Sequence, residues 1–130
     1  MRKILFKAKR KDNNEWVQGL PVCGVFSKDQ TITHIDTETQ EFDSPYEIVQ
    51  KTLCQYTSRN DKFGNPIFEG DVVRTQYGRL CYVIWFSRNT YVGWDLCPLE
   101  DKNPCPDEDI WTAQYLEVVG NIFDGWENTN

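Results

Sequence analysis

The chain has 130 residues, of which 39% are hydrophobic and 26% charged, and it contains 5 Trp, 6 Tyr and 7 Phe. This composition excludes a disordered chain and supplies large apolar side chains for the core of one ordinary domain or two very small ones. The formal net charge of -6 disfavours non-specific nucleic-acid binding by the whole surface. No apolar run approaches the roughly 20 residues of a membrane-spanning helix, so we expect no membrane association.

The N-terminal segment predicts a β-hairpin. The run ILFKAKR alternates weakly, the polar run KDNN marks a turn, and EWVQG provides a return strand. Asp12, Asn13 and Asn14 tolerate the dihedral angles of a tight turn. The apolar run Ile4–Phe6 is too short for a signal-peptide core of about 7–15 residues, so we expect a cytoplasmic protein.

Positions 1–11 contain a local excess of positive charge, whereas acidic residues predominate in positions 96–130. The basic side chains either form the solvent face of an edge strand, where charge blocks unwanted pairing, or contact a phosphate backbone or a partner. The opposite charges at the two ends also permit head-to-tail or isologous self-association. The candidate contact residues in this segment are Arg2, Lys7, Lys9, Arg10 and Lys11.

Short strands are predicted between residues 21 and 57, at VCGVF, TITHI and QEF. The run SPYEIVQKTLCQYTS fits either a short helix that begins at Ser44–Pro45 or a strand that ends at Tyr56 or Thr57, and we expect the strand. The only histidine, His34, lies in TITHI. No partner acid marks it as a catalytic base, so we expect a surface histidine on a strand.

The run NDKFGNPIFEGDVV reads as a turn followed by the entry into a strand. Gly64 is available for a positive φ, and Ile67 and Phe68 are expected in a core. The step Gly70–Asp71 is typical of the start of small SH3-like barrels, where the glycine bends the chain and the aspartate accepts backbone hydrogen bonds. The predicted structural turn residues are therefore Gly64, Gly70 and Asp71.

Three strong strand signals follow, at DVVRTQ, RLCYVIWF and YVGWDL, and LEVVGNIFD predicts a last strand that returns to the first. RLCYVIWF is apolar on both faces and should be central. Four aromatic residues on neighbouring strands either fill the core or form a stacking surface for bases or a peptide. They are Tyr82, Trp85, Tyr91 and Trp94, of which Trp85, Tyr91 and Trp94 are the candidate contact residues.

No catalytic, cofactor-binding or metal-binding site is predicted. The 5 cysteines include no CxxC pair and are expected to be small core residues, although Cys97 and Cys105 could pair with each other. Glu69 and Asp71 could hold a divalent cation, but Asp71 could equally satisfy backbone donors, and we expect the structural role. The chain carries no phosphate-binding glycine motif, so we do not expect an enzyme or a cofactor.

The central run QYTSRNDKFGNPIFEGDVV resembles the signature of the YopX family, as do RKILFKAKRKDNNEWVQG at the start and LEVVGNIFDGWE at the end. Two departures are Ser58–Arg59 in place of the usual Gly-Leu and Gly125–Trp126 in place of the usual Asn-Pro. The resemblance implies a small protein encoded by a bacteriophage or prophage, mostly β with an SH3-like barrel element. It implies no defined catalytic residues, and self-association would be unsurprising.

Together these patterns predict an all-β protein with at most a short helix, in which residues 1–54 form a β-hairpin or meander subdomain and residues 55–130 an SH3-like barrel. The leading functional hypothesis is a non-catalytic accessory module that acts through self-association and through contacts with a phage or host protein. The alternative is a nucleic-acid-associated protein that uses the basic strand and exposed aromatics. A third hypothesis is an enzyme with a metal at Glu69 and Asp71.

Overall fold

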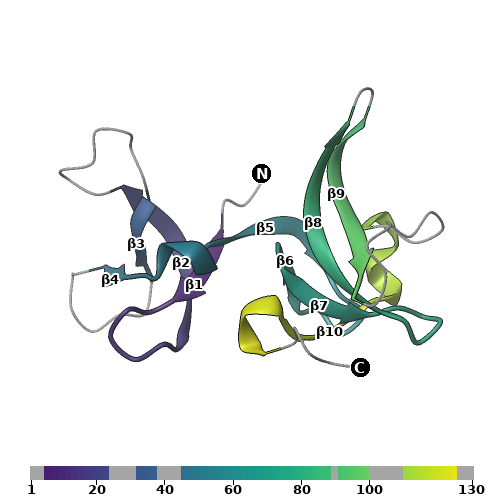
Figure 1. The fold of residues 1–130 in the computed structure, drawn as a ribbon, viewed down its shortest axis with the longest axis horizontal. Coiled ribbons are helices and arrows are strands. Elements are labelled where there is room, and N and C mark those ends of the chain that lie inside the picture. The colour runs from purple at the N-terminus through teal and green to yellow at the C-terminus, as the bar shows by residue number, and fades with distance from the viewer. Residues whose placement is uncertain (1–4, 24–31, 38–44, 89–90, 100–109, 126–130) are drawn as a thin grey trace. The chain divides into compact units, whose positions relative to one another are not determined.

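The computed structural model describes residues 5–23, 32–37, 45–88, 91–99 and 110–125, and within these ranges the chain is all-β apart from three short 3-10 helices. It divides into two compact units, Met1–Tyr56 and Thr57–Asn130 (Figure 1). Within the described ranges, no helix has the length and apolar character to cross a membrane. The predicted all-β class is confirmed.

The first unit is built on the predicted hairpin, which is confirmed. The two strands pair antiparallel, with Lys9 opposite Trp16, and Asn14 in the turn has a φ of 62°. Ala8 and Ile35, on two different strands, are fully buried in the core of this unit. Phe6 packs against the same core because alternate residues of a strand face the same side, and it lies two residues before Ala8. Its strands belong to a six-stranded sheet of order β4-β3-β2-β1-β5-β6, in which β5 runs across the boundary between the units at Tyr56. In chain order the first five are β1 (Phe6–Lys9), β2 (Trp16–Cys23), β3 (Ile32–Asp36), β4 (Tyr46–Glu47) and β5 (Cys54–Asn60).

The segment that begins with β4 is hydrogen-bonded on two sides. The Ile48 amide donates to the Thr33 carbonyl at 3.1 Å, and the Val49 amide donates to the Lys9 carbonyl at 2.8 Å. A 3-10 helix, η1 (Gln50–Thr52), then leads into β5. The predicted single strand ending at Tyr56 or Thr57 was therefore wrong: a helical turn interrupts it, and β5 continues to Asn60.

The second unit contains a four-stranded antiparallel sheet of order β10-β7-β8-β9, with β8 inside it as predicted. The core of this unit includes Ile67, Val83 and Leu96, all at most 1% exposed, and the predicted burial of Phe68 is also confirmed. The elements are β6 (Pro66–Phe68), β7 (Asp71–Arg74), β8 (Leu80–Arg88), β9 (Tyr91–Pro98), η2 (Ile110–Tyr115), β10 (Glu117–Asn121) and η3 (Ile122–Asp124).

The predicted SH3-like barrel is not seen. The last strand does return to the first strand of the meander, since β10 pairs with β7. Closing the sheet would also require hydrogen bonds between its two edge strands, β10 and β9. Among the described residues, no pairing joins β10 to β9, so the sheet does not close into a barrel. The predicted QEF strand, Arg2, Cys105 and the side chain of Tyr91 lie outside what the structure describes.

Candidate binding surfaces

The Gly70–Asp71 corner is a structural element, as the sequence predicted. Gly70 has a φ of 81°, and the Asp71 side chain is fully buried. Its Oδ2 accepts a hydrogen bond from the Phe68 amide at 2.8 Å, and its Oδ1 accepts one from Asn121 Nδ2 at 3.0 Å. Both carboxylate oxygens thus join β7 to its neighbours, which is the structural role expected for Asp71.

A second buried carboxylate, Asp61, holds the turn before β6. Its Oδ1 accepts hydrogen bonds from the amides of Phe63 at 2.9 Å and Asn65 at 2.8 Å. Its Oδ2 accepts one from the amide of Val118 on β10 at 2.9 Å. Burial, the largest single influence, raises the pKa of Asp61, but the hydrogen bonds from Val118, Asn65 and Phe63 outweigh it, so the pKa lies below its ordinary value. Asp61 thus ties the turn to β10.

No metal centre is found in the described part of the chain, where no three His, Cys, Asp or Glu side chains converge. Cys54, Cys81 and Cys97 are buried, and none of the three is in a disulfide with another described residue. His34 lies half-buried on β3, with Nδ1 at 2.7 Å from Thr33 Oγ1. The residues that carry charge and aromatic rings on the surface are therefore the candidates for function.

The first candidate surface is the cationic-aromatic face of the β1–β2 hairpin, formed by Lys7, Lys9 and Trp16. Lys9 stands opposite Trp16 in the register, and Lys7 is two residues away on the same face. Their ammonium nitrogens lie 5.5 Å and 4.9 Å from the centre of the Trp16 ring. At these distances the ring attracts both cations, so the ring and the two charges form one surface.

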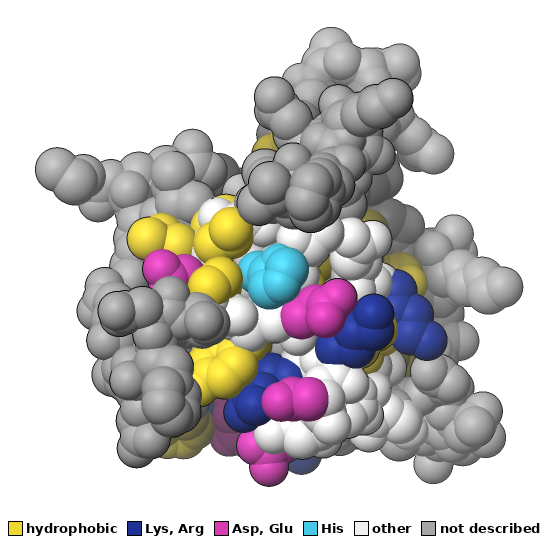
Figure 2. All heavy atoms as spheres, turned by 90° about the vertical axis from the view of Figure 1, so that its left-hand side faces the viewer, with side chains coloured by type: hydrophobic (Ala, Val, Ile, Leu, Met, Phe, Trp, Pro, Cys, Tyr) yellow, Lys and Arg dark blue, Asp and Glu magenta, His cyan; other side chains and the backbone are white. Residues whose placement is uncertain are grey.

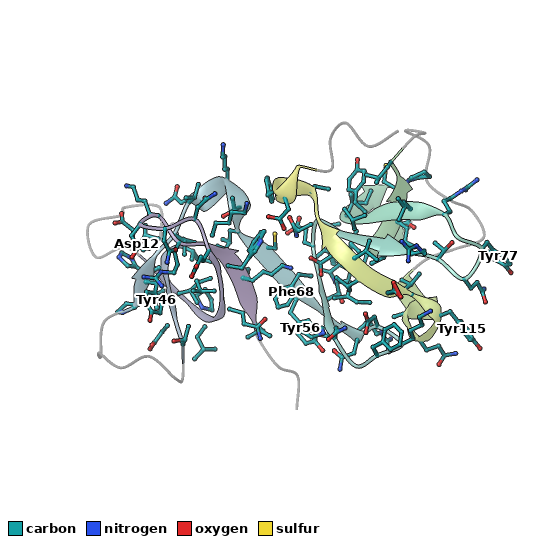
Figure 3. The ribbon with its side chains drawn as sticks, turned by 90° about the horizontal axis from the view of Figure 1, so that it is seen from below. Asp12, Tyr46, Tyr56, Phe68, Tyr77 and Tyr115 are labelled. Atoms are coloured by element: carbon teal, nitrogen blue, oxygen red, sulfur yellow. The ribbon has the colours of Figure 1, made fainter. Side chains whose placement is uncertain are left out.

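The neighbouring basic residues are paired with acids. The Arg10 guanidinium donates to both oxygens of Asp12, at 3.0 and 2.6 Å, and lies 4.2 Å from the centre of the Tyr46 ring. The hydrogen bond between Arg10 and Asp12 raises the pKa of Arg10 and lowers the pKa of Asp12. Lys11 Nζ lies 3.4 Å from Glu47 Oε2. Asp12 and Tyr46 lie at the same end of this unit (Figure 3).

These pairs surround a shallow hollow of about 360 Å³, lined by Lys11, Asp12, Pro45, Tyr46 and Glu47. Figure 2 shows acidic and basic side chains intermixed below and to the right of the histidine on one face of this unit, with hydrophobic side chains on its other side. Mixed charge of this kind does not create the single-sign potential that attracts a phosphate backbone over distance. Lys7 and Lys9 remain phosphate-contact candidates because both lie against the Trp16 ring, which could stack on a base.

The second candidate surface is the outer part of the β8–β9 hairpin, called here the β8–β9 ribbon and defined as residues 84–88 and 91–95. β7 pairs only with Leu80, Cys81 and Tyr82 of β8, whereas β9 pairs with β8 as far as Arg88. Figure 1 shows β8 and β9 continuing together past β7. In the described pairings, the ribbon therefore has β9 on one side of β8 and no strand on the other.

Two of the predicted aromatic contact residues meet on this ribbon. Trp85 and Trp94 stand opposite each other, with ring centroids 4.9 Å apart and an interplanar angle of 77°. Trp94 is buried, with 8% exposed, and its ring supports Trp85, of which 51% is exposed. Among the side chains that the structure describes, the expected stacking surface is therefore reduced to Trp85, and Trp94 belongs to the core beneath it.

Comparison with known protein families decides the family of the chain. The family model described as YopX protein matches residues 5–127. The chain belongs to the YopX family. The match spans most of the chain, so both candidate surfaces lie inside the region that matches the family model. No curated protein sequence matches the chain.

In this YopX family member, the sequence did not reveal the partners of the predicted basic residues. Trp16 could have been found from the hairpin register, since a short turn fixes which residues face each other. Tyr46 and Glu47 could not, because no local pattern places them beside Arg10 and Lys11, 36 positions away. The open edge of β8 comes from strand lengths that the sequence did not give, since β7 ends at Arg74 and has four residues where the run DVVRTQ predicted six.

Proposed function

We propose that this YopX family member is a non-catalytic accessory module that acts through protein contacts, the first of them with a second copy of itself. Its setting is the cytoplasm of a bacterium that carries a phage or prophage, and further partners are phage or host proteins. The observation that carries the proposal is the β8–β9 ribbon, where a half-exposed Trp85 stands at a strand edge that the described pairings leave open. Monomeric proteins usually shorten, charge or cover such edges.

Trp85 has the properties of an anchor residue for a protein contact. Trp is among the residues that contribute most to binding energy at interfaces, and a rigid support limits the entropy lost on binding. Trp94 provides that support at a centroid distance of 4.9 Å. Tyr77 is more exposed, at 77%, but it lies in the turn between β7 and β8 and points outward (Figure 3). It is therefore a suitable control position.

The proposal predicts a dimer or larger assembly at micromolar concentration, measured by light scattering coupled to size-exclusion chromatography. Trp85→Lys should raise the dissociation constant by about tenfold or more, because it removes the anchor and places a charge at each interface. Tyr77→Lys introduces the same charge outside the ribbon and should leave the constant unchanged. A monomer mass for the unaltered chain across the concentration range would contradict the proposal.

A second candidate is binding of single-stranded nucleic acid by the cationic-aromatic face of Lys7, Lys9 and Trp16. An aromatic ring flanked by two cations can stack on a base while the cations contact its phosphates. The net charge of -6 opposes this function. The half-burial of Trp16 also limits the ring area available for stacking.

The second candidate predicts that a fluorescent single-stranded DNA binds at low salt and dissociates as salt rises, with a slope of about -0.7 per phosphate contact. Lys7→Ala combined with Lys9→Ala should weaken binding at least tenfold and reduce the slope, since two phosphate contacts are lost. Lys51→Ala, an exposed lysine on η1, is the matched control. Fluorescence anisotropy that stays flat at low salt would rule this candidate out.

A further inference from the structure

The direction of the backbone groups on the outer part of β8 is fixed by its neighbours. In an antiparallel strand, the N–H and C=O of one residue point to the same side, and successive residues alternate. The Val83 carbonyl accepts from Gly70 on the β7 side at 2.8 Å, and the Leu80 carbonyl accepts from Leu99 on the β9 side at 3.2 Å. Odd-numbered residues of β8 therefore direct their backbone groups away from β9.

By this alternation, Trp85 and Ser87 present two N–H donors and two C=O acceptors at the open edge of β8. Within the described pairings, β7 ends its contact at Tyr82, and the bond from Gly70 to Val83 is the last on that side. The edge that remains, Ile84–Arg88, offers as many donors as acceptors. It is therefore self-complementary, as a twofold symmetric interface must be.

We infer that the open edge of β8 pairs antiparallel with the same edge of a second copy, with the twofold axis at position 86. This inference rests on the proposed self-association and specifies its geometry. Trp85 of each copy then stands opposite Ser87 of the other, and each pair exchanges two hydrogen bonds.

Centring the pair at 85 would place Val83, whose carbonyl is already bonded to Gly70, opposite Ser87. Centring it at 87 would leave Trp85 outside the strand pairing. Only position 86 uses all four groups on each side.

Backbone complementarity favours a second copy as the occupant of this edge. In the register centred at 86, each donor that Trp85 and Ser87 direct to the open edge meets an acceptor of the second copy, and each acceptor meets a donor.

A cysteine cross-link tests the register. Position 86 becomes a directly opposed, non-hydrogen-bonded pair, where Cα atoms lie about 4.5 Å apart, within the range of a disulfide. Phe86→Cys should therefore give a covalent dimer under mild oxidation, seen on non-reducing gels. In Ser87→Cys the two Cα atoms are separated by more than about 7 Å, so this control should not cross-link. The unaltered chain under the same conditions gives the background from its own cysteines.

A second variant keeps the test independent of the cross-link. Ser87→Pro removes an N–H that points to the open edge and leaves the β8–β9 ladder intact. It should raise the dissociation constant roughly tenfold or more, because each dimer loses two hydrogen bonds, while the far-ultraviolet circular dichroism spectrum is unchanged. These experiments distinguish a failure of the proposed self-association from a failure of the proposed register. A monomeric unaltered chain overturns the self-association itself. A dimer that resists Ser87→Pro, or that cross-links in the Ser87→Cys variant and not in the Phe86→Cys variant, overturns only the register.

Discussion

Replacing Asp71 with Ala should lower the free energy of unfolding by about 3 kcal/mol, measured by urea denaturation at neutral pH. The carboxylate is fully buried and accepts hydrogen bonds from the Phe68 amide and from Asn121 Nδ2. Alanine leaves both donors in the core without an acceptor, and an unsatisfied buried donor costs about 1–3 kcal/mol. The sheet should lose the connection between β7 and β10 at this corner.

Glu69→Ala is the matched control, since it removes a carboxylate two positions away that lies only half-buried. Its effect should stay within about 0.5 kcal/mol. The comparison also separates the structural role from a metal site, which would use both carboxylates. Equal losses in the two variants would count against the structural role. So would a melting temperature of the unaltered chain that rises with Mg²⁺, Mn²⁺ or Ca²⁺ and no longer does so in either variant.

Asn121→Ala and the double variant measure how far the two buried side chains act together. Asn121 Oδ1 also accepts from the Phe123 amide at 3.0 Å, so its loss affects the start of η3 as well. Since Asp71 and Asn121 are in direct contact, the two losses should not add, and a coupling of about 1 kcal/mol is expected. Additive losses would show that the bond between them contributes little to stability.

The features that the sequence predicted correctly depend on short segments of chain. The β1–β2 hairpin follows from a polar turn between two alternating runs, and Asn14 adopts the positive φ that such a turn requires. The central position of β8 follows from its two apolar faces. Burial is complete only at Cys81 and Val83, whereas Tyr82 and Ile84 are half-buried and Trp85 is exposed. Asp71 follows a bend at Gly70, where its carboxylate reaches a backbone amide three residues back.

The features that the sequence did not predict depend on contacts between distant segments. The Asp61 carboxylate bonds to the amide of Val118, 57 residues later, and no local pattern identifies that partner. The SH3-like barrel was predicted from a meander, but closure is decided by whether two edge strands meet, which the order of strands along the chain does not determine. The strand predicted through residues 50–52 is a 3-10 turn, which Thr52 stabilises by donating to the Val49 carbonyl at 2.6 Å.

Asp61→Asn should lower the free energy of unfolding by about 2 kcal/mol at neutral pH, and the difference from the unaltered chain should shrink in acid. The amide group of asparagine keeps one acceptor oxygen, but it places a donor against one of the amides of Phe63, Asn65 and Val118. Hydrogen bonds to a charged acceptor are also stronger than those to a neutral one. The loss should therefore exceed that of an exposed carboxylate, for which Asp124→Asn in the same unit is the control.

The pH dependence follows from the lowered pKa of Asp61, which the three amide hydrogen bonds hold below its ordinary value against the effect of burial. A carboxylate with a lowered folded pKa contributes stability that is complete above the unfolded pKa of about 3.9 and is lost as pH falls through the folded pKa. Urea titrations at steps from pH 7 to pH 2 should show the two unfolding curves converging below pH 4. Curves that stay parallel over this range would mean that ionised Asp61 does not hold the turn to β10. The stability of that connection would then have to come from the Lys62 amide, which donates to the Leu116 carbonyl at 2.9 Å.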